Sequence, residues 1–208
     1  MSSAYNPNSI PFIVLDGSSG SGKTQTAFTL MSTFKVAYVP CVTNSESSHQ
    51  KIVSAFRNRT ALYVACVQED IRNFPFYPRE VSMHILMEQS ETLKLCTYTF
   101  ICALLTGNRS SLEGITRNQA LTKLNGIRGV FFMDESPDYN PQAQDADAVI
   151  FQLRFMCTVV GSLGLVGILS SVHGTTMNLF INENKESRGR GGPPKLLCYV
   201  VPEFPKFE

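Results

Sequence analysis

Residues 11 to 24 read PFIVLDGSSGSGKT, and this stretch decides the fold of the chain. From Gly17 to Thr24 it fits the G-x-x-x-x-G-K-[ST] pattern of a phosphate-binding loop, and the mainly apolar run before it predicts a buried strand. Such a loop works when a buried strand leads into it and a helix leaves it. The alternative is a Gly/Ser-rich turn that contains a lysine, which these flanks disfavour.

The residues of this loop have separate tasks in nucleotide binding. The glycines let the backbone wrap closely around phosphate, and the loop N–H groups together with the next helix N-terminus attract the anion. We expect Lys23 to reach the outer phosphates from an exposed loop, and Thr24 to offer its hydroxyl to the Mg2+ that accompanies a nucleoside triphosphate. The predicted nucleotide-binding residues are Gly17, Ser18, Ser19, Gly20, Ser21, Gly22, Lys23, Thr24 and Gln25.

A second motif lies far downstream, where residues 129 to 135 read GVFFMDE and predict a buried strand that ends in two acids. In P-loop proteins such a strand places an aspartate beside the metal, so Asp134 is the predicted Mg2+ ligand together with Thr24. Glu135 is then placed to polarise the attacking water as a general base. Acids also often cap a strand and begin a turn, and the following SPD is turn-like. Because the phosphate loop is in the same chain, we interpret the pair as catalytic.

A third apolar run, LVGILSS at residues 165 to 171, turns polar at its end and is followed by His173. NTPases of the additional-strand, catalytic-glutamate class place such a strand between the loop strand and the acidic strand. A polar residue at its tip senses the terminal phosphate. Ser170, Ser171 and His173 are the candidates for this sensor. Alternatively, serine and glycine only end the strand, and a following threonine caps the next helix.

The polar stretch NENKESRGRGGPP, residues 182 to 194, predicts a mobile loop before the last strand because it is rich in glycine, proline and mixed charge. Arg188 or Arg190 could act on the terminal phosphate as an arginine finger, in the same chain or in a neighbouring copy. Both could instead be solvated loop charges. A contact with nucleic acid is a further alternative, because the R-G-R-G-G run resembles segments that bind it.

Composition and charge fit a single globular domain. The chain has 208 residues, of which 43% are hydrophobic and 17% charged, and this length can bury one sizeable core. A net charge of +1 gives no electrostatic argument for nucleic acid or a membrane surface as a partner. The six cysteines form no C-x-x-C pair and the three histidines are scattered. We therefore expect small buried thiols in a reducing compartment, with no disulfide framework and no zinc site.

The chain contains no pattern typical of a secretory leader or a membrane span. Residues 1 to 9 are polar and lack a basic region followed by an apolar one. The longest apolar stretch, residues 148 to 172, contains Arg154 and several glycines, which a membrane span tolerates poorly. We interpret it as a buried helix, a turn at 161 to 164 and a strand, and we expect a soluble intracellular protein.

The remaining pattern alternates strands and helices. Strands are expected at 11 to 16, 35 to 40, 129 to 134, 165 to 171 and 196 to 201, and helices at 23 to 34, 48 to 74, 79 to 105 and 145 to 160. A capping box from Thr116 to Gln119 predicts one more short helix. Five strands with helical crossovers predict an α/β fold, a three-layer P-loop NTPase with a mainly parallel five-stranded sheet covered on both faces.

We expect residues 1 to 208 to form a single P-loop NTPase domain with three parts. Residues 10 to 47 contain the phosphate loop and the first two strands. Residues 48 to 124 form an enlarged helical block between the second and third strands. Residues 129 to 201 contain the acidic strand, the sensor strand and the last strand.

In this order, the motifs resemble the P-loop NTPase domain of Crinkler-type effectors of oomycetes and fungi. The similarity runs through residues 10 to 201 and is carried by DGSSGSGKTQTAF, a following Tyr-Val-Pro strand, FFMDE and GILSSVHGT. It implies that Lys23 and Thr24 bind nucleotide and Mg2+, and that Asp134 and Glu135 form the metal and hydrolysis pair. It also implies a secreted effector delivered to the host cytoplasm or nucleus, acting with host proteins or with further domains.

The sequence therefore predicts Mg2+-dependent binding and hydrolysis of a nucleoside triphosphate, with ATP as the expected substrate, by a regulatory or effector module. Two alternatives stay open. A small-molecule kinase uses the same loop but needs an acceptor-binding carboxylate and a set of lid arginines. A nucleotide-binding switch with little turnover uses the same residues in an incomplete site, which a homo-oligomer could complete with an arginine from its neighbour.

Overall fold

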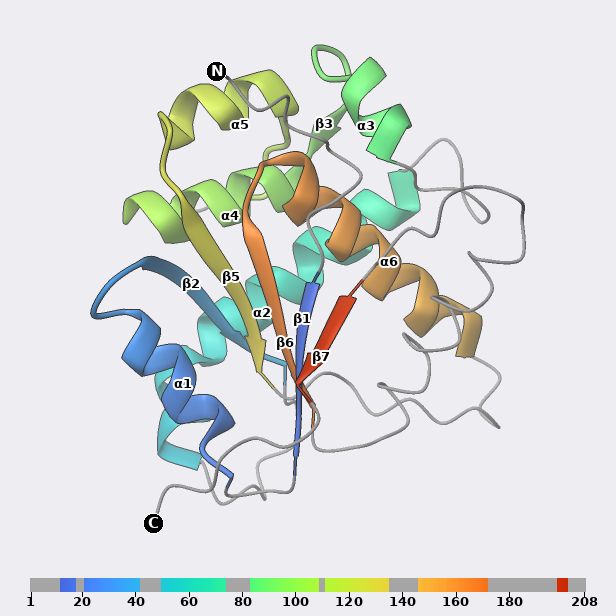
Figure 1. Ribbon diagram of the computed structural model, residues 1–208. Helices are drawn as coiled ribbons and strands as arrows, with labels where there is room; N and C mark the ends of the chain where they lie inside the picture. Colours follow the sequence, from blue (N-terminus) through green and yellow to red (C-terminus); the bar gives the residue numbers. More distant parts are fainter. Residues whose placement is uncertain are drawn as a thin grey trace.

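The computed structural model describes residues 12–17, 21–41, 50–73, 83–108, 111–134, 146–171 and 198–201. A five-stranded sheet lies at the centre, with helices packed against it (Figure 1). Its strands are β1 (Phe12–Asp16), β2 (Lys35–Pro40), β5 (Gly129–Asp134), β6 (Val166–Ser171) and β7 (Cys198–Val201). All of the pairings between these strands are parallel. This confirms the predicted α/β fold with a parallel five-stranded sheet.

The order of the strands across the sheet is β2-β5-β6-β1-β7. β6 therefore lies between β1, which leads into the phosphate loop, and β5, which ends in Asp134, as Figure 1 shows. The register aligns Leu15 with Ser170 and Pro40 with Asp134. Because all of these strands run in the same direction, the residues that follow them meet at one edge of the sheet.

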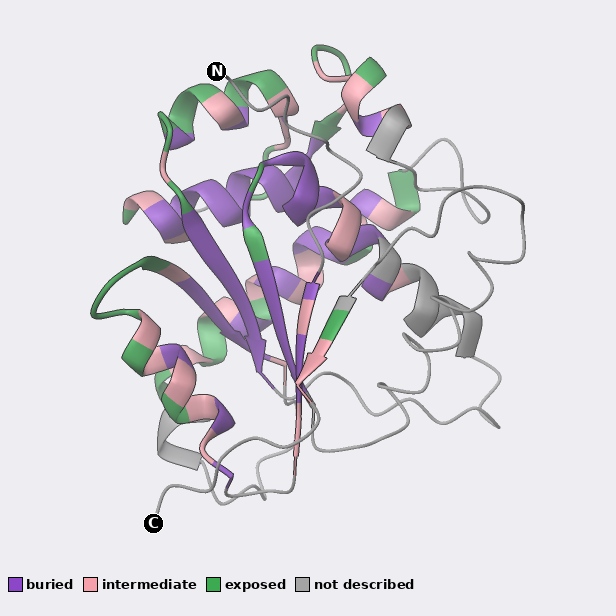
Figure 2. Ribbon diagram, viewed as in Figure 1, coloured by how far each residue is buried: buried purple, intermediate pink, exposed green. Residues whose placement is uncertain are grey.

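Helices cover both faces of the sheet because each buried strand has apolar side chains on both sides. α1 (Lys23–Leu30) packs on one face through Ala27, beside a core that includes Phe132. α2 (Gln50–Asn73), α4 (Cys96–Thr106) and α6 (Ala146–Ser162) contribute most of the larger core on the other face. β5 is buried along its whole length, as Figure 2 shows.

The block between β2 and β5 is not purely helical. It also contains α3 (Met83–Glu88), α5 (Arg117–Leu124) and a two-stranded antiparallel sheet of β3 (Lys94–Leu95) and β4 (Ile115–Thr116). The predicted capping box of α5 is confirmed, because Thr116 Oγ1 accepts from the Gln119 N–H while Gln119 Oε1 accepts from the Thr116 N–H.

The predicted single helix over residues 79 to 105 is wrong, because α3 ends at Glu88 and α4 begins anew at Cys96. The cause lies in another helix. The carboxylate of Asp70 on α2 accepts the backbone N–H groups of Cys96 and Thr97 at 2.7 and 2.8 Å. The Asp70 carboxylate thereby satisfies the first N–H groups of α4, which begins as a new helix. The residues just before α4 pair as β3.

Two helix ends also differ from prediction. α1 ends at Leu30 rather than Phe34, because the Ser32 hydroxyl and N–H both donate to the Thr29 carbonyl at 2.7 and 3.2 Å. Such i to i−3 bonds tighten the chain into a turn. α6 continues to Ser162, so the turn expected at 161 to 164 is shorter and contains Gly164 at φ +71°.

Two further expectations concern the membrane and the cysteines. Within the described residues, no helix combines the length and the apolar character needed to cross a membrane. Among the cysteines whose side chains the structure describes, Cys41, Cys66, Cys96, Cys102 and Cys157 form no disulfide, and Cys66, Cys96 and Cys102 are buried. This agrees with the interpretation of these residues as small apolar side chains.

Candidate functional site

The predicted phosphate loop begins at Gly17, directly after β1, and ends where α1 begins at Lys23. The N-cap of α1 is Gly22, whose φ of +87° lies in the left-handed region that favours glycine. Since glycine has no side chain, the N-cap makes no side-chain hydrogen bond to the first turn of α1. A helix N-terminus of this kind suits an anion. Ser18, Ser19 and Gly20 lie outside the described residues.

Lys23 is buried, with 6% of its surface exposed, so the expectation of an exposed lysine is wrong. Its Nζ donates to the carbonyl oxygen of Gly17 at 2.7 Å and to the hydroxyl of Ser21 at 3.2 Å. Both partners belong to the loop itself. The lysine therefore links the start of the loop to its end.

Asp134 lies at the end of β5, and only 3% of its surface is exposed. Its Oδ2 accepts a hydrogen bond of 2.6 Å from the hydroxyl of Thr24 in the first turn of α1. These residues are 110 positions apart in the chain. The structure thus brings together the two residues that the sequence predicts as Mg2+ ligands.

Two more hydroxyl groups bind the same carboxylate. The Tyr38 hydroxyl donates to Asp134 Oδ2 at 2.7 Å, and the Ser170 hydroxyl donates to Asp134 Oδ1 at 2.7 Å. Ser170 is fully buried, and it was one of the three candidates for a phosphate sensor. Its hydroxyl binds the carboxylate of the acidic strand, and the sensor role stays a prediction.

The register of the sheet explains this convergence. Alternate residues of a strand point to the same face. Because β2 and β5 pair Tyr38 with Phe132 and Pro40 with Asp134, Tyr38 is a diagonal neighbour of Asp134 on the same face. The β5 and β6 pairing reaches Met133 and Leu169, so Ser170 follows beside Asp134.

Tyr38 was not predicted as a site residue. It lies in a strand whose other residues after Lys35 are apolar, and its ring packs against Phe28, Phe56 and Phe132 with centroids 5.3, 5.1 and 6.0 Å away. A buried tyrosine hydroxyl normally finds a polar partner. A tyrosine within an apolar strand therefore indicated that Tyr38 would have such a partner. The identity of the partner depends on strand register, which the sequence does not reveal.

The chemistry of the donor set fits Mg2+. This ion prefers oxygen ligands and is usually held by one or two carboxylates together with substrate phosphates. Thr24 and Asp134 offer one hydroxyl and one carboxylate beside the N-terminus of α1. Elsewhere in the described residues, no group of three or more His, Cys, Asp or Glu side chains could hold a metal ion.

The outcomes for the other predicted site residues differ. Gln25 is exposed on α1. Ser171 ends β6 and pairs with Asp16, and the description of the structure does not extend to its side chain. Four predicted residues lie outside the described residues, and their roles stay predictions: Glu135, His173, Arg188 and Arg190.

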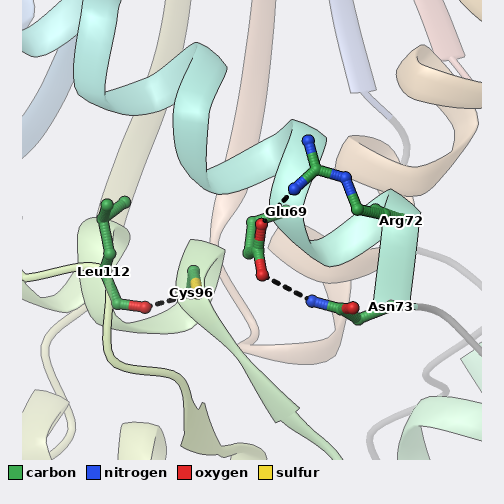
Figure 3. A network of polar contacts seen from close by, with 5 residues as sticks. All are labelled: Glu69, Arg72, Asn73, Cys96 and Leu112. Carbon is green, nitrogen blue, oxygen red and sulfur yellow. Dashed lines mark hydrogen bonds and ion pairs between the residues drawn. The ribbon is translucent and has the colours of Figure 1, made fainter.

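A second polar cluster lies at the carboxyl end of α2, where a cavity of about 220 Å³ adjoins Asp70 and Cys96. Figure 3 shows Glu69 accepting from Arg72 at 2.8 Å and from Asn73 at 2.7 Å, while Cys96 donates to the Leu112 carbonyl. Burial raises the pKa of the Cys96 thiol to about 11. A protonated thiol is a poor nucleophile, so the Cys96 thiol is not suited to nucleophilic catalysis.

Asp70 itself is only 4% exposed. Burial raises the pKa of its carboxyl, although the hydrogen bonds from Thr97 and Cys96 oppose that change. Its bonds to the first turn of α4 explain why a carboxylate is kept in this buried position.

Comparison with known proteins does not assign the chain to a family. No protein-family model matches the chain, and no curated protein is significantly similar to it. The functional interpretation therefore rests on the residues of this chain.

Proposed function

We propose that this protein binds and hydrolyses a nucleoside triphosphate in a Mg2+-dependent reaction, with ATP as the expected substrate. The observation that carries the proposal is the 2.6 Å hydrogen bond between Thr24, in the first turn after the phosphate loop, and Asp134, at the end of β5. A loop pattern alone can occur by chance. A loop pattern whose threonine meets a buried carboxylate from a distant strand is far more specific.

The order of the sheet supports a finer assignment. We place the fold in the additional-strand, catalytic-glutamate class of P-loop NTPases, because β6 lies between β1 and β5. In that class the residue after the metal-binding aspartate is the general base. Glu135 directly follows Asp134, and we propose this role for it.

The chain's own residues divide the work as follows. The backbone N–H groups at the start of α1 bind phosphate oxygens. Lys23 exchanges its bonds to Gly17 and Ser21 for bonds to the outer phosphates. Thr24 and Asp134 hold Mg2+, which when bound neutralises charge that develops on the phosphates. Glu135 takes the proton of the attacking water.

The test compares Thr24→Val with Thr29→Val. Both threonines lie on α1, but Thr29 is exposed and its hydroxyl donates to the Gln25 carbonyl, away from Asp134. Triphosphate affinity is measured by calorimetry with Mg2+ and with EDTA. We expect Mg2+ to strengthen binding in the wild type and in Thr29→Val, and much less in Thr24→Val. A wild type that binds no triphosphate would overturn the proposal.

Phosphate release then separates hydrolysis from its alternatives. Release of inorganic phosphate without any acceptor supports an NTPase. Transfer that needs an added acceptor indicates a small-molecule kinase, and tight binding without turnover indicates a nucleotide-binding switch.

The regulatory or effector role is a proposal that rests on the resemblance of the motif order to that of the Crinkler NTPase domain. It predicts that any effect of the protein in host cells depends on nucleotide binding. Expression of the wild type and of Lys23→Ala at equal levels tests this, because an equal effect of both proteins would contradict it.

A further inference from the structure

We propose that Tyr38 and Ser170 are positioning residues that hold the Asp134 carboxylate in the orientation needed for its contact with Mg2+. This inference rests on the proposed function and deepens it. Neither residue belongs to the phosphate loop or to the acidic pair. Both act through Asp134, because their hydroxyls donate to its two carboxylate oxygens at 2.7 Å.

The first argument is a count of hydrogen-bond acceptor positions. An ionised carboxylate offers about four of them. Among the described residues, Thr24 and Tyr38 donate to Oδ2, and Ser170 donates to Oδ1. The side chains of the described residues therefore leave one position untaken, on Oδ1. With that position the carboxylate would accept a hydrogen bond from the waters that a bound Mg2+ usually keeps.

The second argument is that the donors cannot move away easily. The Tyr38 ring is enclosed by Phe28, Phe56 and Phe132. The Cys41 N–H donates to the backbone carbonyl of Asp134 at 2.7 Å, so β2 and β5 stay joined beside the carboxylate. The Tyr38 hydroxyl is therefore held by a rigid ring on a strand that is hydrogen-bonded to Asp134 itself.

The third argument is energetic. Groups that orient a metal ligand usually contribute 10 to 100-fold, roughly, to metal affinity or activity. Without Tyr38 and Ser170, the carboxylate would keep only the Thr24 bond among the described residues and could rotate. Thr24 would also lose its fixed partner. The two hydroxyls thus preorganise the predicted metal site before nucleotide arrives.

The experiment compares Tyr38→Phe and Ser170→Ala with Tyr98→Phe as the matched control. Tyr98 is also a fully buried tyrosine, but its hydroxyl bonds to Ser162 at 3.0 Å and its side chain belongs to the core on the other face. The dissociation constant of a non-hydrolysable ATP analogue is measured with Mg2+ and with EDTA. The readout is the ratio of these two constants, so it does not depend on turnover.

We expect the strengthening of binding by Mg2+ to fall about 10 to 100-fold in Tyr38→Phe and in Ser170→Ala. Affinity in EDTA should equal that of the wild type, and Tyr98→Phe should behave as the wild type in both conditions. A merely structural role of Tyr38 or Ser170 would lower affinity in EDTA as much as affinity with Mg2+ and would leave the ratio unchanged.

Two outcomes would overturn the inference, and they are distinguishable. If both variants keep the wild-type ratio, Tyr38 and Ser170 do not position the carboxylate, while the proposed function stands. If Mg2+ does not strengthen binding in the wild type, the proposed function fails and the inference falls with it. Should Tyr38→Phe fail to fold, Ser170→Ala decides, because Ser170 donates independently to the other carboxylate oxygen, Oδ1.

Discussion

Lys23 Nζ donates a hydrogen bond of 2.7 Å to the carbonyl oxygen of Gly17, so the cation that is expected to contact phosphate is bound inside its own loop. The same ammonium donates to the Ser21 hydroxyl at 3.2 Å. A nucleotide must therefore compete with these internal bonds for the lysine. Lys23 both holds the loop conformation and provides the positive charge expected to contact phosphate. Its replacement is therefore expected to affect stability and nucleotide binding.

We predict that Lys23→Ala abolishes triphosphate binding and also lowers the melting temperature. Binding is lost because the charge on the outer phosphates is no longer balanced. Stability falls because the bond to Gly17 comes from a charged donor, and such bonds contribute about 1.5 to 3 kcal/mol. Lys35→Ala is the control, since Lys35 is exposed at the start of β2. Unchanged affinity in Lys23→Ala would exclude the loop as the binding site.

Asp134→Asn should abolish the Mg2+ dependence of binding and destabilise the fold. The amide nitrogen that replaces one carboxylate oxygen is a donor, and three hydroxyl donors surround this position. At least one buried hydroxyl then loses its acceptor, which costs about 1 to 3 kcal/mol. Chemical unfolding and calorimetry with and without Mg2+ measure the two effects. A variant as stable as the wild type would contradict the role of this network.

Glu135→Gln should retain nucleotide and Mg2+ binding but slow hydrolysis by about 100 to 10,000-fold, the typical effect of losing a general base. Single-turnover phosphate release measures the step directly. The contrast with Asp134→Asn is the informative comparison, because only one of the two neighbouring acids is expected to change affinity. Hydrolysis at the wild-type rate would place the general base elsewhere.

The stability of the protein should depend on pH through Asp70. Burial raises the pKa of this carboxyl above its ordinary value of 3.8, so the folded state binds the proton more tightly than the unfolded state does. The protonated form contributes its full stability when the pH lies below the pKa of the unfolded state. This stability is lost as the pH rises through the pKa of the folded state. Relative to Asp70→Asn, the free energy of unfolding of the wild type should therefore decrease with rising pH.

Urea unfolding of the two proteins from about pH 4 to pH 7 measures this difference. Glu113→Gln is the control, because Glu113 is exposed and its replacement should leave the pH dependence of the wild type in place. The free energy of unfolding of the wild type minus that of Asp70→Asn should decrease with rising pH. If this difference stays constant or increases, the pKa of Asp70 is not raised in the folded state.

The predicted arginine loop gives a prediction on self-association. If Arg188 or Arg190 acts across a subunit interface, specific activity should rise with protein concentration, because an arginine supplied in trans can raise turnover about 1,000 to 100,000-fold. The Arg188→Ala, Arg190→Ala double variant should lack this rise. Flat specific activity in both proteins would leave the two arginines as solvated loop charges.

The local parts of the site could be predicted from the sequence, because they depend on neighbouring residues. Gly22 adopts a left-handed conformation that the loop pattern requires, and α1 begins at Lys23 as expected. The capping box of α5 uses residues only three positions apart. Interactions between residues this close in the chain can be recognised from sequence motifs.

Non-local contacts decided what the sequence could not. The break before α4 depends on Asp70, which is 26 residues away from Cys96 and belongs to another helix. The meeting of Tyr38 and Ser170 on Asp134 depends on the register of three parallel strands. The sequence by itself therefore determined the glycine N-cap of α1, the five strands and the acidic end of β5, since periodicity and glycine positions encode them. Only the tertiary structure decided which hydroxyls surround Asp134, because strand register is set by packing of the whole sheet.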